Sequence, residues 1–434
     1  MSTRGESDLW VPGIVLLAGT VGLLFLGPEG PVTAVLAILA VLAAAYLFAV
    51  RAALGAPARS FAIVFVGAVL FRGLLVLGPP ALSDDVYRYA WDARVQSAGE
   101  SPYGLAPVDE RLAPLRDGEI HPRINHPDLP TIYPPAAEVL FRVAAALAPD
   151  HPVTALKTLF AAFDLGTVAL VALLLAGRGR RPVEAVVYAW HPLALVEVAW
   201  SGHVEGAGVF FAVLAVWALE RGRRVAAGVA LAIATAVKLV PGLLFPLALP
   251  RSKGRAAAFL AAFAATLAAL ALPYLGSGPE AFASLRVYAA TWSYNSLVWR
   301  ALAPLPGDLG RAIVAVALAA LAVLVAHRRA RPVEGALAVL AGVVVLSPTL
   351  HPWYVLWPLP FVCVRRVPAL LALSLTVLLS YWTLAGARAT GTWRESPWVL
   401  AVEWGVPLAV LAAGGLRARG GRYRWSTDSR KAAR

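Results

Sequence analysis

Two adjacent carboxylates, Asp84 and Asp85, follow a long apolar run directly, within the segment Ser83-Asp84-Asp85-Val86-Tyr87-Arg88-Tyr89. They open the only large polar stretch between residues 9 and 416. A carboxylate at a membrane surface can take the proton of a hydroxyl group, and nearby cations can stabilise a phosphate that leaves as the hydroxyl attacks. That combination describes sugar transfer from a lipid-linked phosphosugar.

Three cationic or basic side chains are candidates to hold such a phosphate: Lys238, Arg72 and His351. Lys238 precedes a Pro-Gly break, and His351 lies in Ser347-Pro348-Thr349-Leu350-His351-Pro352-Trp353-Tyr354. Each of these residues also has an alternative role in which it binds no phosphate. Lys238 could extend its amine to the membrane interface, Arg72 could form an internal ion pair, and His351 could be structural beside its prolines.

The composition predicts an all-α polytopic membrane protein, because 59% of the 434 residues are hydrophobic and only 15% are charged. Apolar runs long enough to span a bilayer recur along the chain, which we interpret as one transmembrane domain, 1–416, with about 11 to 14 transmembrane helices. Two segments, 224–251 and 331–365, have basic clusters at both ends and a Pro-containing break in the middle, so they predict pairs of short, broken helices.

The net charge of +13 comes from short basic clusters between the apolar runs, which argues against a nucleic-acid partner. Placing all of these clusters on the cytoplasmic side satisfies the positive-inside rule. Both termini are then cytoplasmic, residues 81–150 form an extracytoplasmic catalytic loop with a surface helix at 136–147, and residues 417–434 form a basic tail that contacts anionic membrane lipid. We expect a multipass protein of the plasma (inner) membrane.

The segment Ser83-Asp84-Asp85-Val86-Tyr87, followed by Gly99-Glu100-Ser101-Pro102-Tyr103, resembles the first-loop signature of GT-C glycosyltransferases, particularly the polyprenol-phosphate-mannose-dependent enzymes. The resemblance extends over about residues 60 to 366. It also takes in Asn125 to Pro130 with Tyr133-Pro134-Pro135, the stretch 192–205, Lys238 with Pro241, Asn295-Ser296-Leu297, and His351 to Tyr354.

This resemblance implies a GT-C fold, a polyprenyl-phosphate sugar donor, a glycan or lipid acceptor, and inverting transfer with the loop aspartate as base. It makes Asp84 the first choice for that base and Asp85 its substitute or partner. Relatives carry a second aspartate where this chain has Val86, so a divalent cation stays open and no other cofactor is implied. The expected substrate-binding residues are Tyr87, Arg88, Tyr103, His126, Tyr133, His203, Glu205, Asn295, Trp353 and Tyr354.

Several alternatives remain at this point. Asp84 or Asp85 could merely cap the following helix, His203 and Glu205 could be a solvated pair in a loop, and the aromatic residues could form an interfacial belt. The chain has no glycine-rich phosphate loop, so a nucleotide-sugar donor is poorly supported. A transporter or flippase of lipid-linked substrates is the main rival function, followed by a structural protein of envelope assembly.

Overall fold

The computed structural model describes residues 7–249 and 253–419; most of the predicted basic tail, 420–434, lies outside them. The chain folds into helices throughout, which confirms the predicted all-α class. In the described residues, β-type pairing is limited to an isolated bridge between Tyr294 and Thr349. The longer helices are α2 (Trp10–Leu26), α3 (Val32–Ala53), α4 (Phe61–Leu77), α7 (Pro152–Ala176), α10 (Glu205–Glu220), α13 (Lys253–Ala271), α16 (Leu309–His327) and α21 (Pro397–Arg419).

Seven of the described helical stretches are long and apolar enough to cross a membrane: 32–53, 58–77, 152–176, 256–291, 309–327, 368–390 and 397–415. Three shorter apolar helices, α2, α11 (Arg224–Val237) and α17 (Pro332–Leu346), accompany them. A helix satisfies all of its backbone hydrogen bonds internally, which is why apolar runs of this length adopt it in lipid. The protein is therefore a multipass membrane protein.

Both predicted broken helix pairs are present. The first runs from α11 through an extended Lys238 into η6 (Val240–Leu244) and α12 (Phe245–Ala248). The second runs from α17 through residues 347–351 into η8 (Pro352–Leu356) and α18 (Leu359–Val364). Prolines 241, 348 and 352 lack the backbone N–H that a continuous helix needs, so each helix ends before it has crossed a bilayer.

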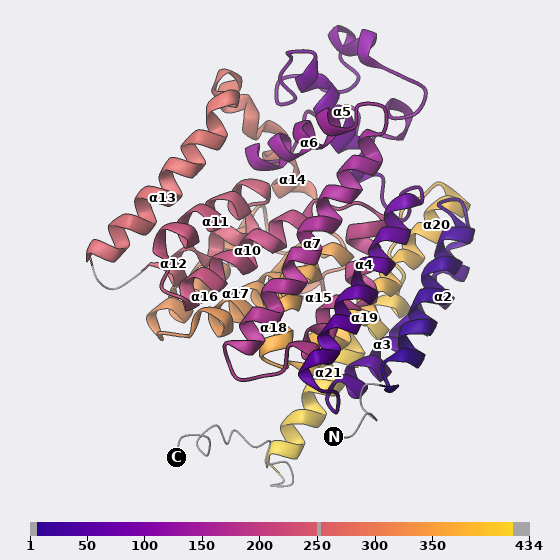
Figure 1. The fold of residues 1–434 in the computed structure, drawn as a ribbon. Coiled ribbons are helices and arrows are strands. Elements are labelled where there is room, and N and C mark those ends of the chain that lie inside the picture. The colour runs from indigo at the N-terminus through magenta and orange to yellow at the C-terminus, as the bar shows by residue number, and fades with distance from the viewer. Residues whose placement is uncertain (1–6, 250–252, 420–434) are drawn as a thin grey trace.

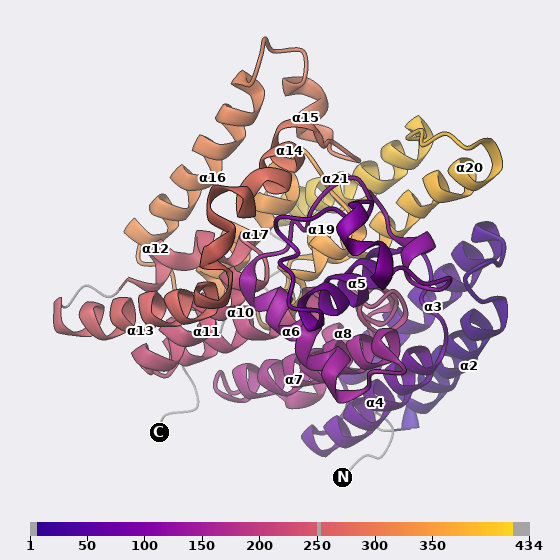
Figure 2. The ribbon, with the colours of Figure 1, turned by 90° about the horizontal axis from the view of Figure 1, so that it is seen from above.

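The segment between α4 and α7 forms a folded layer at one end of the helix assembly (Figure 1). It contains α5 (Asp85–Ser97), η2 (Glu110–Leu115), η3 (His121–Arg123) and α6 (Pro135–Leu147). Seen from above, α5 and α6 lie over the middle of the molecule, with α2 and α3 to one side and α12, α13 and α16 to the other (Figure 2). This layer carries Asp84 and Asp85.

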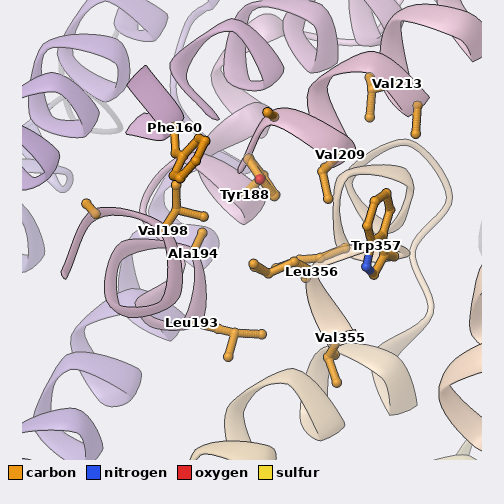
Figure 3. Packing of buried hydrophobic residues seen from close by; sticks show 14 of the residues in the cluster. Phe160, Tyr188, Leu193, Ala194, Val198, Val209, Val213, Val355, Leu356 and Trp357 are labelled. Carbon is orange, nitrogen blue, oxygen red and sulfur yellow. The ribbon is translucent and has the colours of Figure 1, made fainter. Parts of the chain in front are cut away.

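Residues 183–209 are buried without interruption and form the centre of the core. They comprise η4 (Pro182–Ala185), α8 (Val186–Ala189), α9 (Pro192–Ala194), the π-helix η5 (Leu195–Trp200) and the start of α10. Figure 3 shows apolar side chains from this segment meeting Phe160 of α7 and the Val355–Trp357 stretch of the second broken helix. The remaining helices complete the assembly: α14 (Ala283–Thr291), α15 (Leu297–Leu302), α19 (Pro368–Thr376), η9 (Val377–Tyr381) and α20 (Trp382–Thr390).

Candidate active site

Asp85 is the better anchored of the two adjacent carboxylates. Its Oδ1 accepts a hydrogen bond from Asn125 Nδ2 at 2.7 Å, and its Oδ2 accepts one from the Tyr133 hydroxyl at 3.3 Å. The side chain is 17% exposed, so it still reaches solvent at the start of α5. One donor on each oxygen fixes the orientation of the carboxylate, and each oxygen still has a lone pair for another partner.

Asp84 occupies the position before the first residue of α5, but its side chain makes no capping hydrogen bond. It is exposed at the surface. Desolvation by the surrounding loop, followed by the negative charge of Asp85, raises the pKa of Asp84 above its usual value. The helix-capping alternative therefore fails for this residue, and the contacts favour Asp85 over Asp84 as the fixed carboxylate of the site.

The turn between η5 and α10 brings His203 against Asp85. Gly202 has a φ of +81°, and a Cβ there would lie 2.9 Å from Lys157 Cγ and 3.1 Å from Val86 Cγ2. Only glycine fits this approach without strain. It lets the turn pack on the residue that follows Asp85, with His203 Nδ1 3.7 Å from Asp85 Oδ2.

Four aromatic rings form a continuous stack that begins at His203. The His203 ring lies 4.0 Å from the Trp353 ring, Trp353 lies 4.4 Å from His351, and His351 lies 5.0 Å from Tyr294, all at interplanar angles of 28° or less. The backbone bridge between Tyr294 and Thr349 holds the last two elements together. The predicted His351 and Trp353 thus join the predicted His203 in one aromatic wall.

Lys238 lies at the break of the first short helix pair and forms an ion pair with Glu205. Its ammonium also lies 5.1 Å from the centre of the Tyr354 ring, whose hydroxyl is 2.5 Å from that of Tyr288. Glu205 is fully buried, and one of its carboxylate oxygens has no hydrogen-bond partner, whereas the Lys238 side chain is 20% exposed. The solvated-pair alternative for His203 and Glu205 is thereby excluded, since both are 0% exposed.

The carboxylate end and the lysine end of the site are connected through the aromatic rings. His203 lies beside Asp85 and stacks on Trp353, His351 stacks on Trp353 and contacts Tyr354, and the Tyr354 ring lies beside Lys238. The site therefore presents a negative group that can accept a proton and a positive group that can neutralise a phosphate, with an aromatic wall beside them.

Arg72 lies in a separate network. It is buried in α4, pairs with Asp164 of α7 at 2.6 Å and donates to the carbonyl of Ala189 at 2.8 Å. Tyr188 donates a hydrogen bond to the same aspartate. These contacts correspond to the internal ion pair considered above, and they connect Arg72 to α7 and α8 rather than to Asp85.

Other predicted substrate residues hold the 79–151 layer together. Arg88 pairs with Asp92 at 2.8 Å and donates to the Leu129 carbonyl, and the Tyr103 hydroxyl donates to the Tyr133 carbonyl at 2.8 Å. The Tyr87 hydroxyl accepts from Arg123, whose guanidinium also lies over the Tyr87 ring. These interactions orient α5 and keep Tyr133 against Asp85.

His126 and Asn295 lie at the edges of the site. His126 is exposed, and its ring lies 4.7 Å from that of Trp292. Asn295 is buried with a φ of +55°, and its side chain donates to Glu403 at 2.7 Å. Asn295 therefore fastens the segment beside Tyr294 to α21, and His126 joins the 79–151 layer to Trp292.

Sequence reasoning missed three residues that contact this site. Asn125 was quoted within a motif but not chosen, although an Asn in a loop beside two aspartates is a natural donor to them. Tyr288 lies in the aromatic stretch 286–300, which is compatible with an acceptor wall as well as with an interfacial belt. Glu197 had the clearest signal, an acidic residue inside the apolar run 192–200, where a charge is expensive unless it has a function.

Metal coordination finds little support within residues 7–249 and 253–419, where no group of three or more His, Cys, Asp or Glu side chains is arranged to hold an ion.

Comparison with known families gives two matches. Residues 131–352, slightly more than half of the chain, match glycosyltransferase family 87, and residues 301–417 match the MptB C-terminal domain. No curated protein matches the chain. The first match covers Tyr133, His203, Glu205, Lys238 and His351, and it confirms the GT-C resemblance drawn from the sequence. The chain belongs to glycosyltransferase family 87 and is a membrane glycosyltransferase.

Proposed function

We propose that this glycosyltransferase moves a hexose, in the first place mannose, from a polyprenyl phosphate to a glycan or lipid acceptor. The reaction takes place at the extracytoplasmic face of the plasma membrane, with both termini in the cytoplasm. The main support for the proposal is that one aromatic wall has the oriented Asp85 carboxylate at one end and the partly exposed Lys238 ammonium at the other.

The proposed step is a single displacement with inversion. The acceptor oxygen attacks the anomeric carbon as Asp85 takes its proton, and the bond between that carbon and the phosphate oxygen breaks. The electron pair of that bond goes to the polyprenyl phosphate, whose added charge is neutralised by Lys238. Asp84 adds a second carboxylate at the entrance to the same site.

The aromatic wall has a clear part in this step. The Tyr354 ring, which borders the Lys238 ammonium, suits the C–H face of a pyranose ring, whereas both faces of Trp353 are covered by the stacked rings of His203 and His351. The break at Lys238 exposes the amine close to the membrane, where a polyprenyl chain keeps its phosphate. A soluble nucleotide sugar has no lipid chain, so its phosphate would not be held at the membrane.

The test is a donor panel with the purified full-length chain in lipid. Radiolabelled polyprenyl-phosphate mannose, polyprenyl-phosphate glucose and GDP-mannose are each offered with octyl mannoside as acceptor. We expect transfer from a polyprenyl-phosphate donor only, and its loss in the Asp84→Asn/Asp85→Asn double variant at normal expression. Equal transfer from the nucleotide sugar, or full activity in the double variant, would overturn the proposal.

The rival function, a flippase, makes the opposite forecast in the same vesicles. Labelled donor would cross the bilayer without the formation of a glycosidic bond, and the distribution of label would not depend on the acceptor.

A further inference from the structure

Glu197 is a buried carboxylate that the proposed reaction does not use. It lies in the π-helix η5 and is 0% exposed. Its two oxygens each lie 2.9 Å from the Tyr381 hydroxyl, and its backbone carbonyl accepts from the His203 N–H at 2.9 Å. Single π-helical turns are frequent at functional sites, and a buried charge in a membrane protein usually has a task.

His203 lies between this carboxylate and Asp85. Its Nε2 is 3.4 Å from Glu197 Oε2, and its Nδ1 is 3.7 Å from Asp85 Oδ2. Both ring nitrogens are fully buried, and neither has a hydrogen-bond partner. The stack on Trp353 fixes the plane of the ring, so its two nitrogens stay within 3.4 and 3.7 Å of the two carboxylates.

The longer of the two distances has a simple physical reading. An ionised Asp85 and an unprotonated Nδ1 both present lone pairs, so they repel and stay beyond hydrogen-bond distance. A proton captured by Asp85 removes that repulsion and lets the two groups close to a hydrogen bond. Contacts of this kind often tighten only when substrate is bound.

We propose that His203 and Glu197 form a proton relay behind Asp85, with Glu197 as the positioning residue that makes His203 basic. The inference rests on the proposed function, in which Asp85 takes the acceptor proton. Before transfer, His203 carries its proton on Nε2, which lies 3.4 Å from Glu197 Oε2. After transfer, the proton on Asp85 passes to Nδ1, and the resulting imidazolium is stabilised by Glu197, which stays ionised throughout.

One proton leaves the acceptor hydroxyl, passes through Asp85 and is held on His203, which leaves Asp85 ionised while the products depart. To close the cycle, the imidazolium returns that proton to solvent through Asp85, whose side chain is 17% exposed. Tyr381 supports Glu197 by donating its hydroxyl proton as a hydrogen bond. The other charged or titratable groups that act on this cluster are Lys238, Glu205 and His351.

The test compares steady-state transfer by wild type, Glu197→Gln, His203→Gln and the double variant in lipid, with a polyprenyl-phosphate donor. Each single change should lower kcat by at least about tenfold and leave the donor KM within about twofold, because neither residue binds the donor. The double variant should be no slower than His203→Gln, because residues that act as a unit are not additive.

The pH profile separates a relay from a structural role. Glu197→Gln removes a negative charge that favours proton uptake by the cluster, so the acid limb of kcat should move to lower pH. A variant that merely loosens the fold lowers the whole curve without moving that limb.

Tyr381→Phe and Tyr188→Phe form a matched pair, since each removes one hydroxyl that donates to a buried carboxylate. Only the former should change kcat, because Tyr188 bonds to Asp164 in the separate Arg72 network. An unshifted acid limb together with additive losses in the double variant would overturn the relay. Absence of transfer by the wild type would instead overturn the proposed function.

Discussion

The change from Asp85 to Asn is the most informative single substitution in this site. It replaces the proposed base with a neutral group of the same size and removes the group proposed to take the acceptor proton. Loss of a general base costs about 10²- to 10⁴-fold in rate. That range corresponds to about 2.7 to 5.4 kcal/mol of activation free energy.

The structure limits how much of this loss could come from unfolding. Asp85 accepts one hydrogen bond at 2.7 Å and another at 3.3 Å. An asparagine oxygen can keep one of them, so the free energy of unfolding should fall by about 1–3 kcal/mol, the value of one hydrogen bond to a charged group. Expression and thermal midpoint should therefore change little while kcat collapses.

Asp84→Asn is the matched control. The Asp84 side chain is exposed and makes no capping hydrogen bond, so its kcat should stay within about threefold of wild type. The assay is initial-rate transfer of labelled sugar by both variants at saturating donor. The reasoning is refuted if Asp84→Asn abolishes transfer while Asp85→Asn retains it.

Three further outcomes are expected. Lys238→Gln should lower kcat/KM for the donor by about tenfold to a hundredfold, since a charge-assisted contact to phosphate is lost; a change below twofold would contradict a phosphate role. Gly202→Ala should destabilise the fold by about 1–3 kcal/mol and lower activity, because its Cβ meets Lys157 and Val86; Gly222→Ala, with a φ of +68° but open space, is the control for both measurements, and an equal loss there would refute the steric argument. Burial raises the pKa of Glu138 well above its usual value, so the native state keeps a proton that the unfolded chain releases above pH about 4.5. The thermal midpoint should therefore fall as pH rises from that point, and Glu138→Gln should flatten the dependence; an unchanged slope in that variant would contradict the assignment.

Much of the fold could be predicted from the sequence, because lipid imposes simple rules. Apolar length predicts α3, α4, α7 and α16, and proline placement predicts the breaks after α11 and α17. The number of transmembrane segments is harder to predict, because the broken helices are too short to be recognised by their apolar length. Seven described helices meet the criterion for a full span, against the 11 to 14 expected.

The site could be predicted as a set of residues but not as a geometry. Asp85 opens a polar stretch after an apolar run, and Lys238 and His351 are basic groups beside prolines in apolar segments, all of which is visible in the sequence. The approach of His203 to Asp85 depends on a positive φ at Gly202, and no rule of sequence spacing predicts that conformation.

The two adjacent carboxylates show the same limit. Both have the same charge and nearly the same position in the chain, so sequence comparison alone placed Asp84 first. The hydrogen-bond donors that distinguish Asp85 come from Asn125 and Tyr133, which are 40 and 48 residues away in the sequence. They become neighbours of Asp85 only when residues 79–151 fold into a layer.

The most direct test of the account is a structure of the full chain in lipid with a non-reactive polyprenyl-phosphate sugar analogue. The account predicts the phosphate against Lys238, the sugar beside Tyr354, and the anomeric carbon placed so that an acceptor oxygen at about 3–3.5 Å also reaches Asp85. A phosphate bound at Arg72, or a sugar held away from Asp85, would contradict it.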